Sequence, residues 1–176
     1  MPSHNFETML TGGHPNSLGR TVEVVEIVLS NHAAFDELFN CYFSQDEVVR
    51  LRVSNAMKRI AKEQPQLLVP YLDRFLTEIA AINQASTQWT LAQLFLALQS
   101  HLTPEQIVRA KAHLRQNLTH HQDWIVLNHT MQTLAEWSEG DGELRSWLLP
   151  ELQRLQRDPR KSVAKRAKKL EKSLNP

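Results

Sequence analysis

Apolar residues recur every three to four positions along almost the whole chain, which is the spacing of a helix packed on one side. Runs that alternate apolar and polar residues are few, and Asn-Gly turns are absent from the sequence. We therefore expect an all-α protein of about nine helices. Their predicted ranges are 17–30, 33–43, 46–62, 66–82, 86–100, 104–117, 122–138, 142–157 and 159–173.

Two helix starts carry explicit signals. Thr103 is followed by a proline at the first helical position and by Gln106 three residues later, which is the pattern of a capping box. Glycines surround Asp141, so that one helix ends there and Asp141 caps the next. Residues 1–16 are polar and lack the helical spacing. We expect a flexible N-terminal arm over 1–16 and a single helical domain over 17–176.

Every second predicted helix carries a largely apolar triplet at positions i, i+4 and i+7. Successive triplets begin 42, 35 and 37 residues apart. A period of about 35–45 residues with two helices in each unit is typical of an α-solenoid. The triplets are Val49/Val53/Ala56, Leu91/Phe95/Leu98, Val126/Thr130/Thr133 and Val163/Ala167/Leu170.

Two prolines fall inside predicted helices of this repeat. Pro70 lies in LLVPYLDRFL and Pro150 in WLLPELQRLQ, each after a pair of apolar residues. An interior proline removes one backbone hydrogen bond and clashes with the preceding turn, so we expect a kink at both positions.

With these prolines and this period, the sequence resembles the HEAT-repeat (armadillo-like) family. The second helix of a HEAT unit often opens with an Asp, followed by a Val-Arg pair and a small residue. SQDEVVRLRVSNAMKRI, 44–60, matches this pattern, and RDPRKSVAKRAKKL, 157–170, matches it except that Ala164 replaces the arginine. The resemblance covers about 17–173 and implies a right-handed α–α superhelix of four to five repeats, with a concave face that binds a partner.

Tryptophans occupy the same place in the two central repeats, two residues before the triplet. These residues, Trp89 and Trp124, either form an aromatic pair in the groove or fill the seam between repeats. A second stripe lies beside the triplets and is either a binding surface or a solvated face. The candidate binding residues on the concave face are Arg52, Asn55, Arg59, Trp89, Trp124, His129, Gln132, Arg166 and Lys169.

Charge is unevenly distributed along the chain. Residues 1–156 carry 12 Lys and Arg against 17 Asp and Glu, whereas residues 157–176 carry 8 against 2. The basic end either contacts the phosphates of a nucleic acid or presents a polar face that caps the last repeat.

Sequence signals for a catalytic or metal site are missing. The chain has no Gly-rich phosphate loop, nucleophile elbow or HExxH motif, and its histidines lack zinc-site spacing. We therefore expect neither a metal nor a cofactor. Cys41, the only cysteine, lies in an apolar stretch and is expected to be a buried, inert thiol. With no signal peptide or membrane-spanning run visible, we expect a cytoplasmic protein, or a nuclear one in a eukaryote.

The leading functional prediction is a non-enzymatic scaffold that holds a protein or peptide partner. One alternative is an alkylpurine DNA glycosylase, since some of these enzymes are built from HEAT-like repeats. In that alternative, Asp123 would act beside Trp89 and Trp124. A further alternative is non-catalytic nucleic-acid binding through the basic C-terminal helix.

Overall fold

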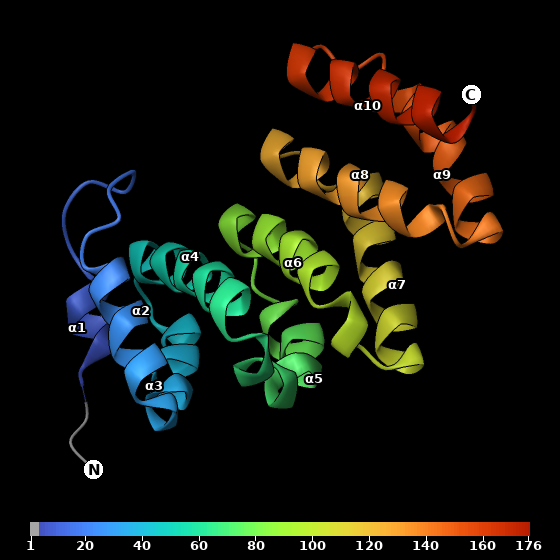
Figure 1. The fold of residues 1–176 in the computed structure, drawn as a ribbon. Helices are drawn as coiled ribbons and strands as arrows, with labels where there is room; N and C mark the ends of the chain where they lie inside the picture. Colours follow the sequence, from blue (N-terminus) through green and yellow to red (C-terminus); the bar gives the residue numbers. More distant parts are fainter. Residues whose placement is uncertain (1–3) are drawn as a thin grey trace. The chain divides into compact units, whose positions relative to one another are not determined.

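The computed structural model describes residues 4–176, and throughout this part of the chain every regular element is helical and none is a strand. The expectation of an all-α fold is therefore confirmed. The chain folds into two compact units, Met1–Thr90 and Leu91–Pro176 (Figure 1).

Helix α4 is the central element of the first unit and packs against α1 and α2. Its apolar triplet, Val49/Val53/Ala56, is completely buried. The helices of this unit are α1 (Phe6–Leu10), α2 (Thr21–Ser30), α3 (Phe35–Asn40), α4 (Glu47–Glu63) and α5 (Leu72–Arg74), and α6 (Ala85–Ala97) begins in it.

Within the predicted N-terminal arm, the structure differs from a loose polar segment. Phe6 and Leu10 lie on α1 and are completely buried, and α1 packs against α4. Both residues are apolar and four positions apart, so they fall on one face of a short helix. A five-residue helix is too short to stand alone in water, and it is stabilised here by this packing.

Arg52 of α4 is buried, with only 1% of its surface exposed, whereas the sequence placed it among the candidate binding residues. Its guanidinium donates hydrogen bonds to four backbone carbonyls, one at the last residue of α1 and three in the loop that follows it. The acceptors and distances are Leu10 O at 2.8 Å, Gly12 O at 2.6 Å, His14 O at 3.2 Å and Ser17 O at 3.2 Å. The planar guanidinium carries five donors, so one side chain can hold several turns of this loop. Arg52 therefore has a structural role.

The segment around Pro70 is not the continuous kinked helix that we predicted. It consists of 3₁₀ turns at Pro65–Leu67 and Val69–Tyr71, the short α5, and a π-helical turn at Phe75–Ile79. Pro70 stands in the turn before α5, where its missing N–H costs no helical hydrogen bond. Pro150, in contrast, does lie inside a helix, α9 (Gly142–Leu155).

In the second unit, α8 (Trp124–Ser138) packs against α7 (Pro104–His120), α9 and α10 (Lys161–Leu174). The predicted caps are confirmed: Thr103 and Gln106 form a capping box at α7, and Asp141 caps α9. Asp158 does not cap α10. Its carboxylate accepts the backbone N–H of Arg160 and pairs with the Arg160 guanidinium at 2.9 Å.

The apolar pattern predicted the cores of both units. All members of the four triplets are at most 7% exposed. Leu72 and Phe75 of the first unit and Phe95, Leu134 and Leu152 of the second are at most 1% exposed. Because the triplets were chosen by helical spacing alone, the predicted register of α4, α6, α8 and α10 is confirmed.

Candidate functional site

The candidate residues of the first unit do not form a common site. Arg52 is buried under the loop after α1. Arg59 is exposed, and its Nε donates to Asn55 Oδ1 at 2.7 Å within α4. Trp89 is half-buried near the start of α6. These residues provide a solvated helix face and a packed tryptophan.

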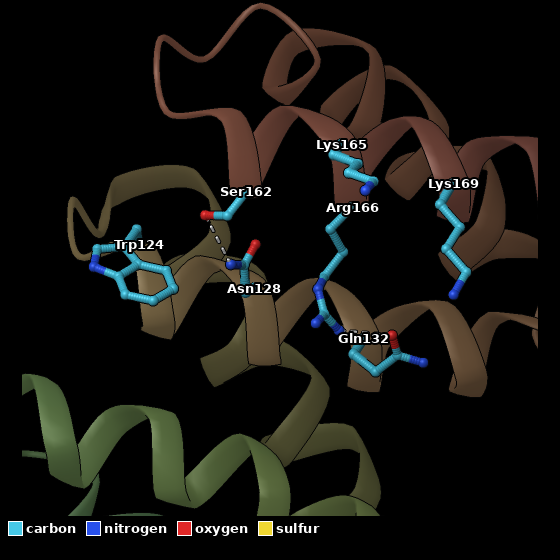
Figure 2. Close-up of a pocket in the computed structure, with 7 residues that line it drawn as sticks. All are labelled: Trp124, Asn128, Gln132, Ser162, Lys165, Arg166 and Lys169. Carbon is cyan, nitrogen blue, oxygen red and sulfur yellow. Dashed lines mark hydrogen bonds between the residues drawn. The ribbon is translucent and has the colours of Figure 1, made fainter.

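Four candidates of the second unit meet at a pocket between α8 and α10. The pocket encloses about 370 Å³ (Figure 2). Its residues are Trp124, Asn128 and Gln132 of α8, and Ser162, Lys165, Arg166 and Lys169 of α10. His129 is not among them, and its two ring nitrogens lie 3.3 Å from Gln93 Nε2.

Two hydrogen bonds join the helices along this pocket. Asn128 Nδ2 donates to Ser162 Oγ at 3.4 Å, and Arg166 Nη1 donates to Gln132 Oε1 at 3.0 Å. On each helix the two bonded residues are four positions, or about one turn, apart. The two helices are therefore parallel along the pocket, and its α8 and α10 walls stay in register from one turn to the next.

The Trp124 indole lies at one end of the pocket, and Lys169 lies at the other (Figure 2). The tryptophan is 47% exposed and is the first residue of α8. Asp123 fixes this helix start, because its Oδ1 accepts the backbone N–H groups of Ile125 at 2.8 Å and Val126 at 3.0 Å. Asp123 does not line the pocket, and its carboxylate serves as a helix cap.

Asn128 provides a buried polar atom that no protein group satisfies. Only 6% of this residue is exposed, and its Oδ1 has no hydrogen-bond partner. If the amide were turned round, Oδ1 would face Ser162 and the nitrogen would lack a partner instead. In either orientation one buried amide atom of the pocket wall is left unpaired, at a cost of about 1–3 kcal/mol.

The α10 wall of the pocket is cationic. Lys165, Arg166 and Lys169 all line it, and no carboxylate lines it. Within residues 4–176 neither lysine has a hydrogen-bond or ion-pair partner, whereas the Arg166 guanidinium has only the neutral Gln132 amide. The α8 wall carries no charge, so the pocket combines one neutral and one positive side.

The described residues bring together no three His, Cys, Asp or Glu side chains that could hold a metal ion. Cys41 is buried, as predicted, and burial raises the pKa of its thiol to about 12. It is therefore protonated at neutral pH and is a poor nucleophile. Among residues 4–176, no helix has the length and apolar composition needed to cross a bilayer.

Asn128, Ser162 and Lys165 were missed by the sequence analysis, although a signal for Asn128 existed. Trp124, Asn128 and Gln132 follow one another at i, i+4 and i+8, and so lie on one face of α8. Ser162 is identified only by the packing of α10 on α8, which the helical period does not determine. The sequence matches no protein-family model, and it matches no curated protein either.

Proposed function

We propose that this chain is a non-enzymatic binding module that holds an extended segment of a partner protein in the pocket between α8 and α10, which we call the groove. The observation that carries this proposal is the pocket itself. It combines a half-exposed indole, a buried amide with an unpaired atom and three cations, all on two adjacent parallel helices. Each of these groups favours a ligand, and none is arranged for bond-breaking chemistry.

The architecture that we propose for the module is a HEAT-like right-handed solenoid. It is supported by the repeated triplets, which are buried on α4, α6, α8 and α10 at a period of 35–42 residues. Successive helices of the second unit also pack on one another, and α10 packs on α8 as well as on α9. Stacked helix pairs of this kind present continuous grooves, and such grooves suit extended segments.

A linear peptide library displayed on phage and panned against the full chain tests the proposal. We expect peptides to be enriched that compete with one another and whose binding is weakened at least tenfold by Trp124→Ala. Val108→Ala is the matched control, since Val108 is an apolar side chain that is 67% exposed and lies on α7, outside the pocket. Its binding should equal that of the unchanged chain.

Two results would overturn the proposal. One is a library that yields no peptide dependent on Trp124. The other is tight binding of single-stranded RNA or DNA that requires Trp124 and Lys165 while no peptide binds, which would make the groove a nucleic-acid site. Base excision gains no support from the geometry, because Asp123 is engaged as the cap of α8.

A further inference from the structure

We infer that the segment held between α8 and α10 is acidic, with Asp or Glu at alternate positions facing α10 and an apolar side chain against Trp124. This inference rests on the proposed function and goes beyond it, because it names the chemistry of the partner. It follows from three features of the pocket: the charge of one wall, the spacing of its cations and the unpaired amide of the other wall.

Charge comes first. Lys165, Arg166 and Lys169 lie along the same side of the pocket, and Figure 2 shows their side chains extending from α10 beside the α8 wall. Like charges on neighbouring turns repel one another, and no carboxylate of the pocket offsets them. Glu136, one turn beyond Gln132, is exposed and accepts from Gln132 Nε2 at 2.9 Å. A ligand that brings negative charge therefore relieves a repulsion that exists without it.

Spacing comes next. Lys165 and Lys169 are four residues apart on α10, which corresponds to about 6 Å along the helix axis at 1.5 Å per residue. In an extended chain, residues i and i+2 point to the same side and are about 6.6 Å apart. An extended segment that follows the groove thus presents every second side chain to successive turns of α10. Two carboxylates at alternate positions match the two lysines, whereas two adjacent carboxylates would point to opposite sides.

The neutral wall favours a peptide over other anions. The buried Asn128 amide has one unpaired atom, which is the oxygen or, with the amide turned round, the nitrogen. An extended peptide supplies both a backbone N–H donor and a C=O acceptor at every residue and so can pair with this amide in either orientation, whereas the sugar-phosphate backbone of DNA supplies acceptors alone. One turn away, the half-exposed indole of Trp124 offers an apolar surface to a side chain of the same segment. These contacts give the segment an apolar end and an acidic end.

Fluorescence anisotropy with four labelled synthetic peptides tests the inference. The first contains a leucine followed by two aspartates at alternate positions in a Ser/Gly background. The second has the same composition with the two aspartates adjacent, the third has serine in place of both, and the fourth lacks the leucine. We expect the first to bind about tenfold more tightly than the third, which loses both charge pairs, and also more tightly than the second, which loses one pair because its two carboxylates point to opposite sides.

Variants of the protein assign the effect to the groove. The double variant Lys165→Gln/Lys169→Gln should lose about tenfold in affinity for the first peptide and should bind the serine peptide as the unchanged chain does. Lys168→Gln/Lys172→Gln is the matched control: it removes the same charge from exposed positions of the same helix that do not line the pocket. Asn128→Leu should weaken all four peptides, since it removes the amide that all four would contact. Far-UV circular dichroism confirms that each variant is folded.

The outcomes separate this inference from the proposed function. If Trp124-dependent peptides exist but the acidic peptide binds no better than the serine peptide, the inference fails and the proposed function stands. The same holds if both double lysine variants lose affinity equally, because the effect is then the general charge of α10. If no peptide binds and a single-stranded oligonucleotide does, both fail.

Discussion

Replacing Arg52 by alanine should free the loop after α1 from the first unit. The Arg52 guanidinium donates to the carbonyls of Leu10, Gly12, His14 and Ser17 at 2.6–3.2 Å, and the residue is only 1% exposed. No other single side chain of α4 has hydrogen bonds to this loop among residues 4–176. The alanine variant therefore removes four charge-assisted hydrogen bonds at one position.

The size of the effect depends on what the carbonyls do afterwards. A hydrogen bond from a charged donor contributes about 1.5–3 kcal/mol, so four bonds would contribute about 6–12 kcal/mol if they were additive and if their acceptors stayed buried. Residues 11–20 are all exposed, however, and once the loop detaches their carbonyls bond to water. Only the Leu10 bond is fully buried. We therefore expect a loss of about 3–5 kcal/mol in the free energy of unfolding of the first unit.

Urea denaturation and amide hydrogen exchange measure this loss. Arg59→Ala is the control on the same helix, since Arg59 is exposed and its guanidinium bonds to Asn55; it should change stability by less than about 0.5 kcal/mol. In Arg52→Ala, exchange should also accelerate for the amides between Leu10 and Gly19. The reasoning is refuted if both alanine variants are equally stable and exchange in the loop is unchanged.

Four further predictions follow from the packing, the backbone and the ionisable groups. Phe95→Ala and Leu72→Ala should each lower the free energy of unfolding, measured with urea, by about 2–5 kcal/mol, because both residues are only 1% exposed. Lys168→Ala and Lys172→Ala should change it by less than about 0.5 kcal/mol, because both lysines are exposed. Gly19→Ala should lower the free energy of unfolding by about 1–2 kcal/mol, because the φ angle of Gly19 is +53° and an added Cβ would lie 2.9 Å from Arg52 Nη1. Gly140→Ala is the control, because a Cβ at Gly140 would have no heavy atom within 4 Å. Equal melting temperatures of the two variants would contradict the prediction. Thr103→Ala should cost about 1 kcal/mol by removing the capping box of α7, and an unchanged melting temperature would contradict this. Burial lowers the pKa of His113 in the folded chain, so at pH values below the ordinary histidine pKa of about 6.5 the unfolded chain binds more protons than the folded chain. The free energy of unfolding should therefore keep the full contribution of His113 above about pH 6.5 and decrease as the pH falls below it. If His113→Gln leaves this pH dependence unaltered, His113 is not its cause.

Helix positions and the core could be predicted because both follow from local spacing. The ranges predicted for α4, α7 and α8 agree with the structure to within three residues at either end. At α7 the predicted capping box of Thr103 and the apolar period indicate the same start, and in the structure Asp46 and Asp123 cap α4 and α8 in a similar way. Agreement between independent local signals makes a boundary predictable from one sequence.

The role of Arg52 could not be predicted in this way. Its position beside the buried triplet places it on the flank of α4, where an arginine is normally solvated. It is buried only because the loop after α1 returns over this flank, and a contact between residues 35–42 positions apart leaves no trace in the helical period. The glycines of that loop were the available clue: Gly12, Gly13 and Gly19 all adopt positive φ, which a tight path requires.

The basic C-terminal helix had two interpretations from the sequence, a polar cap and a surface that contacts nucleic-acid phosphates, and its lysines form two groups in the structure, one inside the pocket and one outside it. Val163, Ala167 and Leu170 are at most 7% exposed and attach the helix to the rest of the second unit. Lys168 and Lys172 are exposed outside the pocket, as a polar cap requires. Lys165 and Lys169 line the pocket opposite its uncharged α8 wall, and neither lysine has a hydrogen-bond or ion-pair partner among residues 4–176. Capping needs only that a side chain be polar, whereas binding needs cations at a spacing that a ligand can match. The i, i+4 spacing of the two pocket lysines meets the second requirement, and it is the reason why we assign the acidic segment to this side of the helix.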